Sequence, residues 1–152
     1  RLSPKAASAY AAVANAVRLL PAQSVVVDGV VTALFPDGRP RAAGLAEALA
    51  GRGDAVLAYY LTDLIFLDGH DVAETPLARR KALLGELIAR VKPPGVLRLS
   101  EHFEGDGAAF FREACRLSLP GTISRRADGH APPRRGEAVL AKCASAKTSA
   151  RP

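Results

Sequence analysis

The spacing of apolar residues changes repeatedly along the chain. Where apolar residues recur every three or four positions the pattern predicts helices, and where β-branched and apolar residues run together it predicts strands. The predicted helices cover 5–19, 41–50, 75–92 and 106–118. The predicted strands cover 24–35, 54–67, 96–99, 121–126 and 139–143. Because helices and strands alternate without regular βαβ spacing, this order predicts an α+β fold with largely antiparallel sheet.

Two of the predicted helices have assignable faces. In the helix that begins at Thr75-Pro76, the threonine hydroxyl is expected to cap the helix and the proline to occupy its first position. The core face of this helix is expected to consist of Leu77, Leu84, Leu87 and Ile88, and its exposed face of Arg79, Arg80 and Lys81. Asp106 is expected to cap the other helix, whose predicted core residues are Phe110, Phe111, Cys115 and Leu117.

Length and charge narrow the class of protein. A chain of 152 residues is long enough for one domain with a core of its own. No apolar run approaches the ~18 residues that span a bilayer, and no signal-peptide layout is present, so a cytoplasmic location without a membrane partner is expected. The net charge of +6 suits a polyanion such as DNA, or else reflects a compositional drift toward arginine. The chain has no methionine and begins at Arg1, which predicts a fragment or a trimmed product.

Side chains suited to thiol or metal chemistry are few. Cys115 and Cys143 lie far apart and have no Cys or His partner at metal-ligand spacing, so they are predicted to be two buried free thiols. His70, His102 and His130 are scattered in turn-like contexts, which predicts neither a zinc site nor a histidine base.

Three segments carry a resemblance to a known family. They are Val27-Asp28-Gly29-Val30-Val31, then Tyr59-Tyr60-Leu61-Thr62-Asp63-Leu64 followed by Leu67-Asp68-Gly69, and a stretch from Ser100-Glu101-His102-Phe103 through Cys115 to Pro120-Gly121-Thr122-Ile123-Ser124-Arg125-Arg126. In this order and spacing they resemble the adenylation domain of bacterial ATP-dependent DNA ligases of the end-joining type. The resemblance implies a ligase-type nucleotidyltransferase fold over 1–143, with mainly antiparallel sheets flanked by helices and incomplete at its N-terminus. Residues 144–152 are expected to form a flexible tail.

The resemblance also implies a chemistry. Ligases of this family join DNA strands in double-strand-break repair: a lysine takes AMP from ATP, the AMP passes to a 5′-phosphate, and a 3′-hydroxyl displaces it. ATP and Mg²⁺ are the implied cofactors, and DNA and end-joining repair proteins the implied partners. The nucleophilic lysine lies in a Lys-Tyr-Asp-Gly motif in the family, and this chain contains no Lys-x-Asp-Gly. No catalytic residue of the family is therefore expected in this chain.

Four residues retained from the family motifs are candidates for binding a nucleotide or its phosphates. They are Asp28, Arg125, Arg126 and Lys142. Arg125 keeps the charge of the family's lysine but not its shape.

Four other motif positions carry residues that cannot perform the family's chemistry. Val30 and Pro120 stand where the resemblance places metal-binding glutamates, and neither offers an oxygen to a hard cation. Thr62 replaces the phenylalanine that stacks on adenine, and Leu140 replaces a phosphate-binding lysine. No metal site is therefore expected.

Two functional interpretations follow. In the first, the chain is a segment of an ATP-dependent DNA ligase-like protein and is catalytically incompetent as it stands. In the second, it is a non-catalytic remnant that binds DNA or a repair partner. Arg79-Arg80-Lys81 and Arg134-Arg135 are candidates for a DNA-facing patch, or else for ordinary solvated charge.

Overall fold

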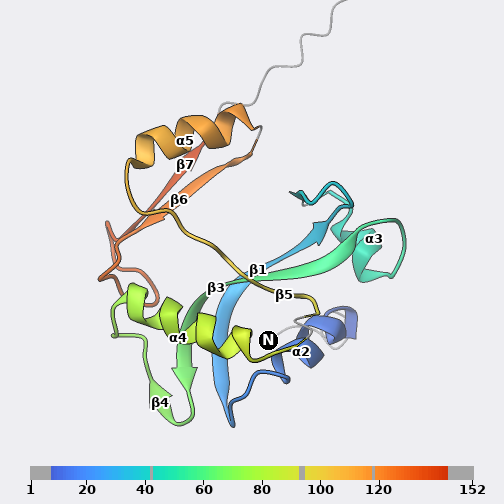
Figure 1. Ribbon diagram of the computed structural model, residues 1–152, viewed down its shortest axis with the longest axis horizontal. Helices are drawn as coiled ribbons and strands as arrows, with labels where there is room; N and C mark the ends of the chain where they lie inside the picture. Colours follow the sequence, from blue (N-terminus) through green and yellow to red (C-terminus); the bar gives the residue numbers. More distant parts are fainter. Residues whose placement is uncertain (1–7, 42, 93–94, 118, 144–152) are drawn as a thin grey trace, which may run out of the picture.

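The computed structural model describes residues 8–41, 43–92, 95–117 and 119–143, which form two sheets with helices packed against them (Figure 1). In chain order the elements are α2 (Ala11–Val17), β1 (Val25–Leu34), β2 (Pro40–Arg41), α3 (Leu45–Leu49), β3 (Val56–Leu67), β4 (His70–Asp71), α4 (Leu77–Ala89), β5 (Leu97–Leu99), α5 (Gly107–Arg116), β6 (Gly121–Arg125) and β7 (Ala138–Lys142). The first sheet has the order β2-β1-β3-β4 with β5 beside β3, and the second consists of β6 and β7. Among the described strands, only the β3–β5 pair is parallel. The predicted α+β fold with mainly antiparallel sheets is confirmed. The expected tail at 144–152 lies outside the described residues.

The pairing of β1 with β3 forms the centre of the first sheet. It runs from Val25 opposite Leu67 to Leu34 opposite Val56, with register shifts beside Val26 and beside Asp28. Gly29 follows the second shift, and a Cβ atom at this position would lie 2.4 Å from the carbonyl oxygen of Tyr60. The close approach of the two backbones therefore depends on a residue without a side chain.

Helices α2 and α4 pack against this sheet and form the hydrophobic core with it. The buried cluster joins residues of α2 and α4 to residues of β3 and β5, and its members are Ala16, Leu20, Leu61, Leu64, Leu84, Leu87, Val91 and Leu97. The predicted burial of Leu77, Leu84 and Leu87 on α4 is confirmed. The predicted exposure of Arg80 is wrong, because this side chain is 0% exposed.

The start of α4 differs from the prediction. Pro76 occupies the N-cap position and no side chain caps the helix, so the expected role of Thr75 is wrong. The amides of Leu77 and Ala78 instead donate to the carbonyl oxygens of Gly129 and Ala127, at 3.1 and 2.9 Å. Unsatisfied amides at the start of a helix need acceptors, and here the loop between β6 and β7 provides them.

The second sheet packs against α5, at the top of the view in Figure 1. Asp106 caps this helix as predicted, accepting from the amides of Ala108 and Ala109. The expected core positions are only partly right, since Phe110 and Leu117 are exposed and Ala114 is the buried residue. The ring of Phe110 stacks on Phe103 outside the sheet, at 5.2 Å between centroids. A two-stranded sheet is too narrow to cover the whole apolar surface of a helix.

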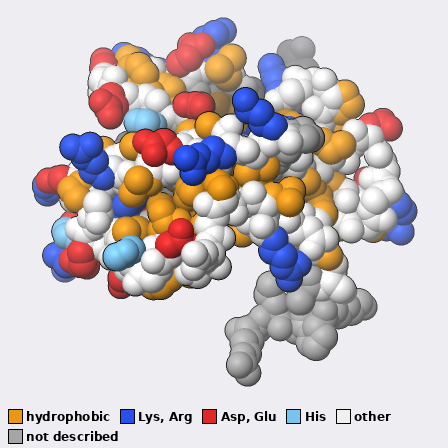
Figure 2. Space-filling view, turned by 60° about the horizontal axis from the view of Figure 1, so that its bottom comes forward, with side chains coloured by type: hydrophobic (Ala, Val, Ile, Leu, Met, Phe, Trp, Pro, Cys, Tyr) orange, Lys and Arg blue, Asp and Glu red, His pale blue; other side chains and the backbone are white. Residues whose placement is uncertain are grey.

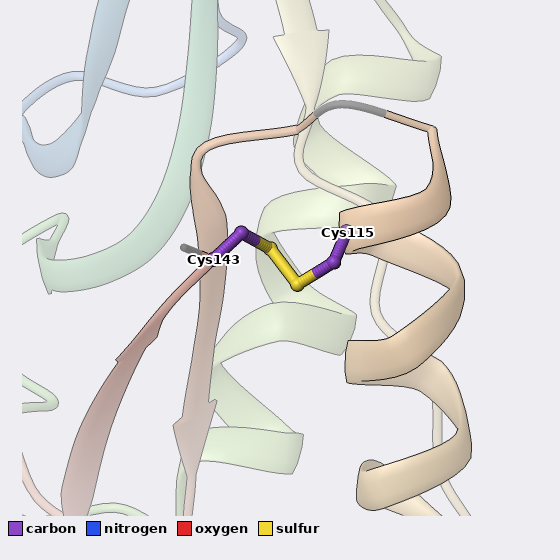
Figure 3. Close-up of a disulfide and its surroundings, with 2 residues drawn as sticks. All are labelled: Cys115 and Cys143. Carbon is purple, nitrogen blue, oxygen red and sulfur yellow. A yellow bond between two sulfur atoms is a disulfide. The ribbon is translucent and has the colours of Figure 1, made fainter. Parts of the chain in front are cut away.

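The two cysteines are joined. Cys115, in the last turn of α5, forms a disulfide with Cys143, directly after β7, at a sequence separation of 28 and with 5.3 Å between their Cα atoms (Figure 3). The prediction of two free thiols is wrong. Sequence distance and missing metal-ligand spacing gave no sign that the antiparallel pairing of β6 with β7 brings Cys143 back to the end of α5.

The helices among the described residues are too short or too polar to cross a membrane.

We expect Gly29→Ala to lower the free energy of unfolding by about 2–3 kcal/mol, because the added methyl overlaps the Tyr60 carbonyl and the Tyr59 ring. Chemical denaturation measures this loss. Gly107→Ala is the matched control, since a Cβ atom there meets nothing within 4 Å and the residue lies in α5. The control is expected to leave stability unchanged or to raise it by up to about 1 kcal/mol. Equal effects of the two substitutions would contradict the proposed close approach.

Candidate functional site: the junction of the two sheets

A buried carboxylate joins the two sheets. Asp63, in the middle of β3, accepts from Nε and Nη2 of Arg80 on α4, at 2.7 and 2.9 Å. Its Oδ2 atom also accepts from Nη2 of Arg125 on β6, at 2.7 Å. Asp63 is 2% exposed and Arg80 0% exposed, so both charges are shielded from water. We call Asp63, Arg80 and Arg125 the Asp63 cluster.

The remaining donor of Arg80 binds backbone. Nη1 donates to the carbonyl oxygens of Gly129 at 2.9 Å, Ala73 at 3.3 Å and Thr75. Among the described residues, every buried side-chain nitrogen and oxygen has a partner. A buried arginine is tolerated only when its charge and its donors are satisfied, and the Asp63 cluster meets both requirements.

Opposing effects act on the pKa values near this cluster. Burial on its own would raise the pKa of Asp63, but hydrogen bonds and charge from Arg80 and Arg125 outweigh burial and lower it. The amine of Lys81 donates to the carbonyl oxygen of Ser100 at 2.6 Å. Burial lowers the pKa of Lys81; Glu101 opposes this effect and Arg125 adds to it. Lys81 is thus half-buried beside the cluster, and the predicted exposed position is wrong.

Sequence reasoning missed Asp63 and Arg80, although a signal was present. Arg80 falls between Leu77 and Leu84 at helical spacing and therefore lies on the stripe that was assigned to the core. Asp63 interrupts an apolar strand of 12 residues. A buried charge requires a partner of opposite sign. A charged residue on the core face of a helix and another of opposite sign inside an apolar strand therefore indicate that the two side chains pair.

Three of the positions singled out from the family motifs, Pro120, Leu140 and Lys142, line one open pocket. We call it the β6–β7 pocket, and its lining residues are Pro120, Gly121, Ile123, Leu140 and Lys142. Gly121 pairs with Lys142 and Ile123 with Leu140, so these four side-chain positions share one face of the sheet. Ile123 and Leu140 are 69% and 58% exposed. The pocket is therefore an apolar surface with one amine, that of Lys142.

The other predicted residues lie elsewhere. Arg126 is exposed and pairs with Asp128 at 2.6 Å. Asp28 and Val30 are exposed on β1, where Asp28 is the register partner of Asp63. Thr62 precedes Asp63 on β3 and is half-buried. Of the four candidates for nucleotide or phosphate binding, Lys142 lines the β6–β7 pocket and Arg125 is held by Asp63.

The loop between β6 and β7 is held by one glutamate. The carboxylate of Glu137 accepts from the amides of His130 and Arg134, at 3.0 and 2.9 Å, and from Nδ1 of His130 at 2.7 Å. These two backbone hydrogen bonds, followed by the imidazole, lower the pKa of Glu137 to about 2. The loop therefore keeps a charged Glu137 at neutral pH and presents its carbonyls to α4.

The donor set does not fit Mg²⁺. Hard cations take several oxygen ligands, and the positions that the resemblance assigns to metal-binding glutamates carry Val30 and Pro120. In the ranges that the structure describes, no three His, Cys, Asp or Glu side chains are grouped to hold a metal.

Comparisons with known proteins relate the chain to a bacterial end-joining protein and to probable DNA ligases. The chain is 35% identical over 102 residues to the multifunctional non-homologous end joining protein LigD of Pseudomonas aeruginosa, and 33% identical over 118 residues to a probable DNA ligase of Sorangium cellulosum. These matches cover 66% and 72% of this chain. They cover 12% and 22% of the relatives, so the chain spans less than a quarter of their length. No family model matches the chain.

Solved structures give the same relationship. A mycobacterial DNA ligase D complexed with ATP and MES superimposes with a TM-score of 0.61 at 28% identity, over 78% of this chain and 38% of that one. The ligase domain of Mycobacterium tuberculosis LigD gives 0.59 at the same identity and coverage. The chain is homologous to the ligase domain of LigD and to ATP-dependent DNA ligases. This ligase homologue keeps the shared fold while its β6–β7 pocket is mostly apolar.

We expect Asp63→Asn to lower the free energy of unfolding by about 3–5 kcal/mol, because the guanidinium of Arg80 then stays buried without a countercharge. Thermal or chemical denaturation measures the loss. Asp128→Asn is the matched control: it makes the same chemical change in an exposed pair with Arg126 and is expected to have little effect. If Asp63→Asn is as mild as the control, the cluster does not hold the two sheets together.

Proposed function

We propose that this chain is a segment of an ATP-dependent DNA ligase-like protein of double-strand-break repair that does not itself form the lysyl-adenylate. The observation that carries the proposal is the β6–β7 pocket, in which two motif positions of the ligase family are occupied by Pro120 and Leu140. The Asp63 cluster supports the same reading, since it preserves the junction of the two sheets. The fold is thus retained while the reactive groups are replaced.

The chemistry of the proposal follows from what each side chain offers. Attack on ATP needs an activated amine and compensation of the phosphate charge. Bound ATP would supply the AMP group for transfer. The chain contains no Lys-x-Asp-Gly, and the charge of Arg125 is committed to Asp63. Thr62 offers no ring on which adenine could stack. Because Arg125 is held by Asp63, Lys142 is the cation of the β6–β7 pocket that can contact a phosphate.

A second candidate function is non-catalytic binding of DNA or of an end-joining repair protein in the cytoplasm. The net charge of +6 and the exposed side chain of Lys142 favour it. The basic patch considered from the sequence is reduced, because Arg80 is buried and Arg134 pairs with Glu74 at 2.7 Å. On the face seen in Figure 2, Lys and Arg side chains are dispersed among acidic and hydrophobic ones. Lys142 is exposed and lines the β6–β7 pocket, so we propose that any DNA contact includes this pocket.

We expect the purified chain to take up no acid-labile label when incubated with α-labelled ATP and Mg²⁺ or Mn²⁺ and run on a denaturing gel. The reason is that the chain contains no Lys-x-Asp-Gly, and that in the described part of the chain no carboxylates are grouped to hold a metal. An active ATP-dependent ligase serves as the positive control. Label on this chain would overturn the proposal, and Lys142→Ala would then show whether the pocket amine carries it.

If the chain binds duplex DNA, Lys142→Gln is expected to weaken binding and to reduce the salt slope of log K by about 1, the value for one lost phosphate contact. Arg125 is left unchanged because it holds Asp63. Arg52→Gln removes the same charge from an exposed site outside the β6–β7 pocket and is expected to change the slope less. Equal losses in the two variants would show that the attraction is not located at the pocket.

A further inference from the structure

The disulfide lies at one end of the second sheet, beside the β6–β7 pocket. Cys143 directly follows Lys142, the last residue of β7, and its amide donates to the carbonyl oxygen of Pro120 at 3.0 Å. Lys142 and Pro120 both line the pocket. Cys115 and Cys143 are half-buried rather than part of the buried core. Figure 3 shows the link between the last turn of α5 and the strand end.

The second sheet has two anchors at opposite ends. At one end, Arg125 of β6 binds Asp63 in the first sheet. At the other end, where Gly121 pairs with Lys142, the disulfide ties the sheet to α5. A sheet of only two strands is marginal by itself. The wall of the pocket therefore depends on a covalent bond that can be opened.

We propose that Cys115 and Cys143 form a reversible redox modification site that controls the wall of the β6–β7 pocket. The co-reactant is a dithiol. Its two thiols are oxidised to a disulfide, while each sulfur of Cys115 and Cys143 takes one electron and one proton as their bond breaks. In the reduced protein α5 is no longer tied to the end of β7, and Lys142 loses its fixed position. Oxidation to the disulfide restores the link between α5 and β7 and the position of Lys142.

The first test measures the site without any ligand. Hydrogen exchange is followed on the oxidised chain, on the chain reduced with dithiothreitol, and on the Cys115→Ser, Cys143→Ser double variant. Reduction and the double variant are expected to speed exchange of amides in β6, β7 and α5 by on the order of tenfold, while β1 and β3 change less. Mass spectrometry and thiol titration verify that the oxidised chain carries no free thiol.

Three results would overturn the inference. The first is an air-exposed chain in which both thiols still react without prior reduction. The second is exchange in β6, β7 and α5 that is the same in the oxidised and reduced chains. The third is exchange that rises equally in β1 and β3, because reduction would then loosen the whole fold rather than the pocket wall.

The effect on binding rests on the DNA-binding function proposed above. We expect reduction to weaken duplex binding about as much as Lys142→Gln does, and to add little in the Lys142→Gln variant. If neither form binds duplex, the proposed DNA binding fails while the exchange result still decides the redox site. If duplex binding is strong and identical in both forms, the control of the pocket by the disulfide is wrong.

Discussion

The carboxylate of Asp63 is the interaction on which the rest of this structure depends. It receives hydrogen bonds from Arg80 of α4 and Arg125 of β6, so one buried group fixes a helix and both sheets. Breaking a buried ion pair costs far more than losing an exposed one, because the remaining charge stays in a region without water. Arg80 also donates to three carbonyl oxygens, among them that of Gly129 in the β6–β7 loop. The position of the second sheet therefore follows from this cluster.

This constraint indicates which parts of the chain can change without loss of the fold. The residues that join the sheets are buried and mutually dependent, so none can change alone without a large loss of stability. Pro120, Ile123, Leu140 and Lys142 of the β6–β7 pocket are exposed, so a change of side chain at these positions leaves no buried charge unpaired. Surface chemistry can thus be lost at little cost to folding.

The disulfide adds a second kind of constraint to the same sheet. The Asp63 cluster positions β6 at one end, and Cys115–Cys143 closes the other end against α5. A narrow sheet that exposes Ile123, Val139 and Leu140 gains little from burial of its own side chains. The sheet is therefore held at its two ends, by the ion pair of Arg125 with Asp63 at one end and by the Cys115–Cys143 disulfide at the other.

The sequence by itself determined the α+β class, the long strands β1 and β3, the cap at Asp106 and the relationship to ATP-dependent DNA ligases. These properties depend on local spacing and on contiguous motifs, which a single chain displays directly. The burial of Arg80, the cap of α4 by carbonyls of Ala127 and Gly129, and the Cys115–Cys143 bond were decided only by the tertiary structure. Each of these joins residues 17 or more positions apart, as from Asp63 to Arg80. Spacing along a chain cannot show which distant segments the packing of two sheets brings into contact.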